Sequence, residues 1–123
     1  LEVMEGLKVM AGKSNILVDL DGVLNTYTGG FDENYIPPVK SGAAEFLTAL
    51  SEKYIVKIFT TRNRLLASKW LIENGLDKYV SDVTNVKEPA VLHIDDRALT
   101  FQGDFDETLR KIKDFKVWYS TLP

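Results

Sequence analysis

One stretch decides the fold of this chain: Asn15-Ile16-Leu17-Val18-Asp19-Leu20-Asp21-Gly22-Val23-Leu24-Asn25. Its apolar run over residues 16–18 is typical of a strand that helices cover on both faces. Asp19 and Asp21 follow, although two neighbouring carboxylates repel each other and are costly to remove from water. Gly22 allows a tight exit from the strand because it has no Cβ. The stretch is typical of an acidic, Mg²⁺-dependent site at the carboxyl edge of a parallel sheet, although Asp-Gly alone also marks an ordinary turn.

The composition limits the classes of protein to which the chain can belong. Its 123 residues suit one core, so we expect a single domain over residues 1–123, with residues 1–14 as an extension or a short strand. The hydrophobic fraction of 45% and the charged fraction of 27% are those of a soluble globular protein. A net charge of −3 argues against a general nucleic-acid or anionic-membrane surface.

The content of cysteine and histidine restricts the chemistry. With no cysteine and one histidine, the chain has no disulfide bond, no thiolate nucleophile and no metal site built from Cys or several His. Any reaction must therefore use carboxylates, hydroxyls, Lys and Arg. No apolar run is long enough to cross a bilayer, and the first residues lack a signal-peptide pattern. We expect a cytoplasmic protein with no membrane partner.

Predicted strands and helices alternate along the chain. Residues 22–38 are rich in Gly, Pro and polar residues and predict a flap with a hairpin that turns at Gly29-Gly30. Trp70, at helical spacing from Leu66, and His93, inside an apolar strand, are expected to pack in the core. Helices are predicted from N-caps at Ser41, Asn63 and Asp104, and further strands over residues 54–60, 79–83 and 90–94, with an edge strand over 117–119. This order predicts an α/β, three-layer, Rossmann-like fold with a mainly parallel sheet and helices on both faces.

Three of the predicted strands end in side chains that can carry chemistry. In an open parallel sheet the carboxyl ends of the strands form the ligand crevice, so we expect these side chains to meet there. Four carboxylates without histidine make an oxygen-ligand site, which selects a hard cation such as Mg²⁺. The side chains are Asp19 and Asp21, Thr60, and Asp95 with Asp96, and Lys87 lies just upstream of the last pair.

This set of groups suits a reaction on phosphate. An Asp carboxylate can attack phosphorus and form an aspartyl phosphate, while a neighbouring Asp that is held neutral can protonate the leaving oxygen. A cation lowers the repulsion between the acids and offsets the charge of a phosphoryl group. Thr60 and nearby backbone N–H groups can donate to phosphate oxygens, and Lys87 can neutralise charge.

Four motifs, taken in order along the chain, resemble those of the haloacid dehalogenase (HAD) superfamily. They are Asp-Leu-Asp-Gly-Val-Leu over residues 19–24, Ile-Phe-Thr-Thr-Arg over 58–62, Lys87, and His-Ile-Asp-Asp-Arg over 93–97. The resemblance implies a HAD-like fold in which the strand that carries Asp19 lies between the strands that carry Thr60 and Asp95. The four motifs would then converge on one Mg²⁺ site.

The resemblance also implies roles for the acidic residues. Asp19 would be the nucleophile and a metal ligand. Asp21 would be the general acid/base, and its backbone carbonyl would also bind the metal. Asp95 and Asp96 would complete the metal site.

The remaining motif residues would handle the phosphate. The resemblance implies that Thr60 donates a hydrogen bond to phosphate and that Lys87 stabilises charge. Thr61 and Arg62 are candidates for substrate contact. The alternatives are that Thr61 opens a turn and that Arg62 makes a structural ion pair.

The second acid and the missing cap narrow the expected function. An Asp two residues after the nucleophile resembles the phosphatase and phosphomutase branches of the superfamily. The connections over residues 22–38 and 81–89 are too short for a cap domain, as in capless members, which take bulky substrates or borrow a neighbouring subunit as a lid. We expect a Mg²⁺-dependent phosphomonoester hydrolase. Its phosphorylated substrate is expected to be bulky, or the chain is expected to form a homo-oligomer in which a neighbouring subunit covers the site. A phospho-Asp signalling module of the receiver type and a non-catalytic binding protein are the alternatives.

Overall fold

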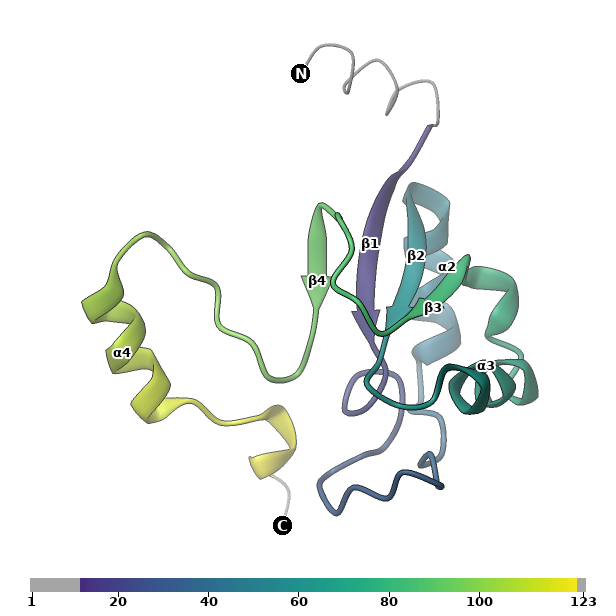
Figure 1. The fold of residues 1–123 in the computed structure, drawn as a ribbon, viewed down its shortest axis with the longest axis horizontal. Helices are drawn as coiled ribbons and strands as arrows, with labels where there is room; N and C mark the ends of the chain where they lie inside the picture. Colours follow the sequence, from purple (N-terminus) through teal and green to yellow (C-terminus); the bar gives the residue numbers. More distant parts are fainter. Residues whose placement is uncertain (1–11, 122–123) are drawn as a thin grey trace.

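The computed structural model describes residues 12–121, and its centre is a four-stranded sheet with parallel pairings (Figure 1). The strands are β1 (Ser14–Asp19), β2 (Tyr54–Phe59), β3 (Asp82–Thr84) and β4 (Leu92–Ile94). They lie in the order β3-β2-β1-β4, so β1 is flanked by β2 and β4. This arrangement confirms the predicted α/β, Rossmann-like fold. The prediction for residues 1–11 lies outside the described residues.

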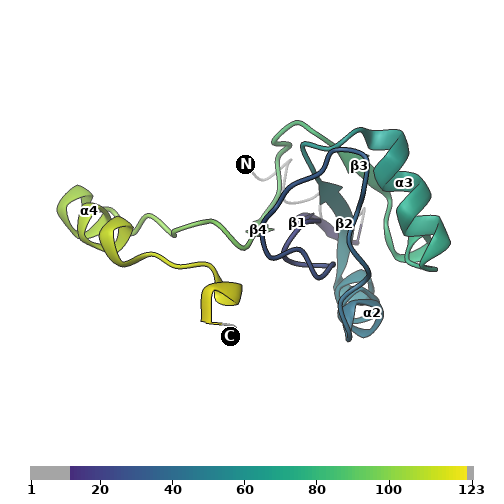
Figure 2. The ribbon, with the colours of Figure 1, turned by 90° about the horizontal axis from the view of Figure 1, so that it is seen from below.

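Two helices pack against this sheet. Helix α2 (Ala43–Lys53) contacts β2, helix α3 (Arg64–Glu73) contacts β3, and the 3₁₀ turn η1 (Asp77–Tyr79) contacts both helices. Helix α4 (Phe105–Asp114) lies away from the sheet in both views of the ribbon and is followed by the 3₁₀ turn η2 (Trp118–Thr121) (Figures 1 and 2). Within residues 12–121, the helical layer on the sheet is therefore made by α2 and α3. No helix of this part of the chain is long and apolar enough to cross a membrane.

The apolar side chains of α4 are exposed to solvent. Phe105, Leu109 and Ile112 recur at helical spacing and are 77%, 61% and 56% exposed. His93 on β4 is exposed as well, so the prediction that it packs in the core is wrong. The reason is that β4 is an edge strand of the sheet and α4 does not cover it.

The core is built between the sheet and helices α2 and α3. Val18 of β1 and Ile58 of β2 are completely buried, as is Leu47 of α2. Trp70 of α3 is buried as predicted, and its indole N–H donates to the carbonyl of Pro37 at 3.2 Å. Because β1 is an interior strand that pairs with β2 up to Asp19 and with β4 up to Val18, its carboxyl end is held in place by both neighbouring strands.

Two of the three predicted helix caps are present. The side chain of Asn63 accepts hydrogen bonds from two N–H groups of the first turn of α3, and Asp104 does the same for α4. The prediction of Ser41 as the cap of α2 is wrong, since the residue before the helix is Gly42. Gly42 has a φ of 91°, a left-handed conformation that residues with a Cβ rarely adopt. The turn into α2 is therefore set by backbone conformation and not by a side-chain cap.

Residues 22–38, here called the flap loop, form an irregular loop where a hairpin was expected. An antiparallel bridge between Asn25 and Val39 closes the loop at its base. The ladder does not continue beyond this bridge because Pro37 and Pro38 have no N–H to donate. The flap loop is thus attached to the sheet end at its base, and no cap domain interrupts residues 12–121.

Two predicted strands are shorter than expected, and a third is absent. β3 begins at Asp82 because residues 77–79 form η1, and β4 begins at Leu92. The edge strand predicted over residues 117–119 is wrong, since residues 118 and 119 belong to η2. There the indole N–H of Trp118 donates to the carbonyl of Gly22 at 2.6 Å. This hydrogen bond holds η2 against the start of the flap loop.

Candidate active site

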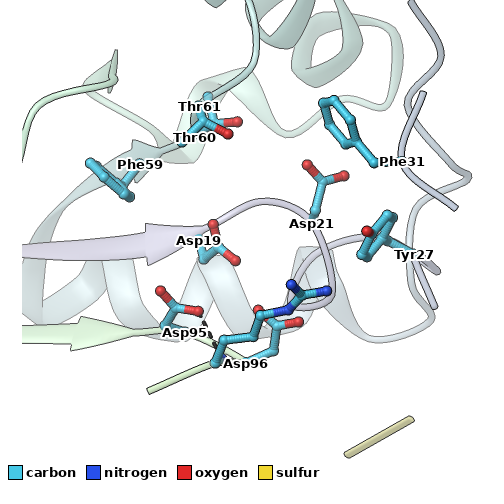
Figure 3. Close-up of a pocket in the computed structure, with 10 residues that line it drawn as sticks. Asp19, Asp21, Tyr27, Phe31, Phe59, Thr60, Thr61, Asp95 and Asp96 are labelled. Carbon is cyan, nitrogen blue, oxygen red and sulfur yellow. Dashed lines mark hydrogen bonds between the residues drawn. The ribbon is translucent and has the colours of Figure 1, made fainter. Parts of the chain in front are cut away.

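The carboxyl ends of β1, β2 and β4 meet at one edge of the sheet, as the sequence predicts. The register aligns Asp19 with Phe59 of β2, and Val18 with Ile94 of β4. The residues that follow these strands therefore face a common cavity of about 430 Å³ (Figure 3). Its lining comprises Asp19, Asp21, Thr60, Thr61, Asp95 and Asp96, together with Tyr27, Phe31, Phe59 and Arg97.

Three of the predicted acids form a tight group in the lining of this cavity. Carboxylate oxygens of Asp19, Asp95 and Asp96 lie within 4.8 Å of one another, and we call this group the acid triad. The Oδ2 atom of Asp96 is buried and has no hydrogen-bond partner within the described residues. Burying a carboxylate oxygen without a hydrogen-bond partner costs free energy. Oδ2 of Asp96 is therefore suited to be a ligand of a bound cation.

Gly22 makes room for the acid triad. It has a φ of 80°, and a Cβ at this position would collide with Oδ2 of Asp96. The residue that the sequence suggests as a strand exit therefore has a second role. Its lack of a side chain lets Asp96 approach the loop that follows β1.

Burial and neighbouring carboxylates raise the proton affinity of two acids of the triad, Asp19 and Asp96. Burial, the charge of Asp95 and a hydrogen bond with Asp96 raise the pKa of Asp19 from 3.8 to about 8. Burial also raises the pKa of Asp96. A divalent cation among three oxygen ligands would relieve this repulsion, and hard oxygen donors are the ligands that Mg²⁺ prefers. The residues present therefore fit a magnesium ion.

The side chain of Asp21 is not part of the acid triad. It accepts hydrogen bonds from Nε and Nη2 of Arg62 at 2.8 and 3.1 Å, and from Nδ2 of Asn25 at 2.9 Å. In Figure 3 it lies on the side of Tyr27 and Phe31, whereas Asp95 and Asp96 lie on the opposite side of Asp19. The metal role predicted for Asp21 therefore rests on its backbone carbonyl alone.

Arg62 forms an ion pair with Asp21. A structural ion pair is the alternative to substrate contact that the sequence analysis gives for Arg62. It is 3% exposed, and its Nη1 donates to the carbonyl of Asp32 at 2.7 Å. Its guanidinium lies 4.5 Å from the centre of the Phe31 ring. Arg62 thus links the flap loop to Asp21, and its donors are directed at the protein.

Thr60 and Thr61 both line the cavity, where they are positioned differently. Thr60 is buried, and its Oγ1 accepts the N–H of Arg62 at 3.1 Å. A hydroxyl that accepts one hydrogen bond still has its own proton to donate, so Thr60 can bind a phosphate oxygen. Thr61 is exposed at the rim of the cavity.

The structure does not bring Lys87 into the cavity. Lys87 is exposed on the connection between β3 and β4, and its neighbour Glu88 pairs with Lys57 of β2 at 2.8 Å. The cation that lines the cavity is Arg97. Its backbone N–H donates to Oδ1 of Asp95 at 2.9 Å, and its guanidinium donates to the hydroxyl of Tyr119 at 3.0 Å.

Asn25 is a site residue that sequence reasoning missed. It is completely buried, and its Oδ1 accepts the N–H groups of Gly22 and Tyr27 at 3.1 and 3.0 Å. Its Nδ2 donates to Asp21, so one amide fixes both the loop after β1 and the second acid. The sequence signal for Asn25 is a polar amide four residues after Asp21 that immediately follows the apolar pair Val23-Leu24.

Comparison with known proteins supports the fold. No family model and no curated protein matches this chain. A solved structure of a conserved protein from Bacteroides thetaiotaomicron is similar to it, with a TM-score of 0.56 and 22% sequence identity. The similarity covers 90% of this chain and 98% of that one. At this level of identity it shows a shared fold alone.

Proposed function

We propose that this protein is a Mg²⁺-dependent phosphomonoester hydrolase that works through an aspartyl phosphate on Asp19. The observation that carries the proposal is the acid triad, whose buried and unpaired Asp96 oxygen lies beside Asp19 in an open cavity. Thr60 lines the same cavity and offers a hydroxyl proton to a phosphate. The HAD-like motifs that contain Asp19, Thr60 and Asp95 line the same cavity and support the same assignment.

Asp19, Asp95 and Asp96 would hold the metal ion. When bound there, Mg²⁺ supplies positive charge that offsets both the acids and a phosphoryl group. Because the raised pKa of Asp19 comes from burial and from the neighbouring carboxylates, that charge would also favour Asp19 as a carboxylate. Asp19 would then be ionised and able to act as a nucleophile at neutral pH.

In the first half-reaction, a carboxylate oxygen of Asp19 attacks phosphorus. A P–O bond to Asp19 forms while the P–O bond to the leaving group breaks. Asp21, having taken up a proton from solvent, gives it to the leaving oxygen. Thr60 and nearby backbone N–H groups donate to the phosphoryl oxygens, on which charge is concentrated.

In the second half-reaction, water attacks the phosphorus of the aspartyl phosphate. Asp21 accepts the proton of that water, and the bond between phosphorus and Asp19 breaks to release inorganic phosphate. The carboxylate of Asp21 accepts three hydrogen bonds, two from Arg62 and one from Asn25, and these fix the direction in which its oxygens point.

The open cavity suggests a substrate that extends beyond it. Within residues 12–121 no cap domain covers the acids, and the flap loop borders one side of the cavity. A bulky substrate, or a second copy of the chain acting as a lid, would exclude water from the site.

The test is turnover of 4-nitrophenyl phosphate by the wild-type chain and the Asp19→Asn variant. We expect Mg²⁺-dependent phosphate release by the wild type that stops on chelation and is absent in Asp19→Asn. The matched control is Asp77→Asn in η1, because Asp77 is exposed and does not line the cavity. Wild-type rates in the Asp19→Asn variant would reject the nucleophile. If the wild-type chain turned over no phosphomonoester, the assignment as a hydrolase would be rejected.

A further inference from the structure

Two aromatic side chains of the flap loop border the cavity near Asp21. Tyr27 and Phe31 both line the cavity, and in Figure 3 their rings lie on either side of the Asp21 carboxylate. Asp21 is the residue that would protonate the leaving oxygen under the proposed function. The rings therefore lie where a leaving group would be, and the acid triad lies where the phosphate would be.

Phe31 is held in place from one side only. The residue is 54% exposed, and the guanidinium of Arg62 lies 4.5 Å from the centre of its ring. Arg62 is itself fixed by Asp21 and by the carbonyl of Asp32. Phe31 is exposed, so packing in the core does not explain why a phenylalanine occupies this position. Its position is nevertheless set by a buried cation, which leaves the rest of the ring available to a ligand.

Tyr27 is supported by a different part of the chain. Its backbone N–H donates to Asn25, and its ring meets the ring of Tyr119 edge-on, with 6.2 Å between the centres. The hydroxyl of Tyr119 in turn accepts a hydrogen bond from Arg97. Turn η2 thus supports Tyr27 in the way that Arg62 supports Phe31.

Rings placed in this manner bind other rings well. Aromatic pairs prefer offset or edge-on contacts, and a stacked ring contributes binding energy that a flexible polar chain does not. In a phosphoryl transfer the attacking and leaving oxygens lie roughly in line, so the leaving group departs on the side opposite Asp19. The two rings lie beside the proton donor for that departing group.

We propose that Tyr27 and Phe31 make this site selective for phosphate esters whose leaving group carries a planar aromatic ring. The inference rests on the proposed function, since it assigns the substrate class of the same site. A nucleoside 5′-monophosphate and O-phosphotyrosine share this chemistry. They differ in the distance between ring and phosphate, so a comparison of the two identifies the source of the ring.

The experiment measures kcat/KM with Mg²⁺ on O-phosphotyrosine, adenosine 5′-monophosphate and glycerol 3-phosphate, which has no ring. We expect Phe31→Leu and Tyr27→Leu to lower kcat/KM on a ring-bearing ester about fivefold more than on glycerol 3-phosphate, the factor for one lost ring contact. The control is Tyr35→Leu, because Tyr35 belongs to the same flap loop and is 57% exposed but does not line this cavity. An equal loss on all three esters would overturn the inference and leave the hydrolase intact.

A binding measurement separates this inference from the proposed function. Calorimetry with the wild type and Phe31→Leu compares adenosine 5′-monophosphate, which carries adenine at C1′, with ribose 5-phosphate, which carries a hydroxyl group there. Tighter binding of the ring-bearing ligand, lost in Phe31→Leu, supports the ring site even if no ester is hydrolysed. Equal affinity for the two ligands, or binding of neither, overturns it whether or not the chain is a phosphatase.

Discussion

The guanidinium of Arg62 binds both carboxylate oxygens of Asp21, with Nε 2.8 Å from Oδ2 and Nη2 3.1 Å from Oδ1. The two residues are 41 positions apart in the sequence, and the pair joins the end of β2 to the loop after β1. A two-point contact of this kind fixes the plane of a carboxylate as well as its position. Arg62 is therefore a positioning residue for Asp21 under the proposed mechanism.

Replacing Arg62 with Lys should lower kcat with little change in KM. Lysine keeps the charge but cannot make the two-point contact, so Asp21 loses its fixed orientation. We expect kcat on glycerol 3-phosphate, which has no ring to contact Phe31, to fall by about tenfold or more, since small displacements of reacting groups have effects of this size. The control is Arg64→Lys at the exposed start of α3. A rise in KM at constant kcat would instead assign Arg62 to substrate binding.

The metal-free protein should lose stability as the pH rises. The pKa of Asp19 is raised from 3.8 to about 8 by folding, so between these values the folded state holds a proton that the unfolded state has released. The unfolding free energy then falls with increasing pH over this range. We expect the Tm of the chelated protein to decrease from about pH 5 to pH 8, and this decrease to be smaller in Asp19→Asn.

Mg²⁺ should reverse this loss most strongly at the upper end of the range. Metal binding requires deprotonated carboxylates, so the ion competes with the proton that Asp19 holds at lower pH. The rise in Tm on adding Mg²⁺ should therefore be larger at pH 8 than at pH 5, and should be lost in Asp96→Asn. Thermal scans at both pH values, with and without chelator, measure this. A rise of equal size at both pH values would contradict the expectation.

Replacing Gly22 with Ala should be more damaging than the same change at Gly75. Both glycines have positive φ, 80° and 68°, so backbone strain of roughly 1–2 kcal/mol is common to the two variants. A Cβ at Gly75 meets no atom within 4 Å, whereas one at Gly22 collides with Asp96. We expect Gly22→Ala to cost more in urea unfolding and to weaken the stabilisation by Mg²⁺. Similar losses in both variants would show that the acid triad tolerates the methyl group.

The strand ends could be predicted from the sequence because they depend on local patterns. The apolar run before Asp19 fixes a central strand, and parallel strands place their carboxyl ends at one edge. Asp19, Thr60, Asp95 and Asp96 therefore come together as expected. The glycines of the flap loop predict a hairpin, which the structure does not contain. Pro37 and Pro38 lack the backbone N–H groups that a strand pairing with the residues after Asn25 would need.

Contacts between distant residues could not be predicted in the same way. No spacing rule pairs Arg62 with Asp21 or Trp118 with Gly22, because these contacts depend on how loops fold over the sheet edge. The exposure of His93 depends on where α4 lies, which no pattern within β4 reports. Lys87 lies on the exposed connection between β3 and β4 and does not line the cavity. Its catalytic role therefore stays a prediction of the family resemblance.

Helix α4 is held differently from the rest of the chain. It has ten residues and no buried side chain, and it lies away from the sheet (Figure 1). Helices shorter than about 12–15 residues are marginal in water without tertiary packing, so its backbone hydrogen bonds should open and close on their own. Amide protons of α4 are therefore expected to exchange with solvent through local fraying, whereas those of β1 wait for the whole sheet to come apart.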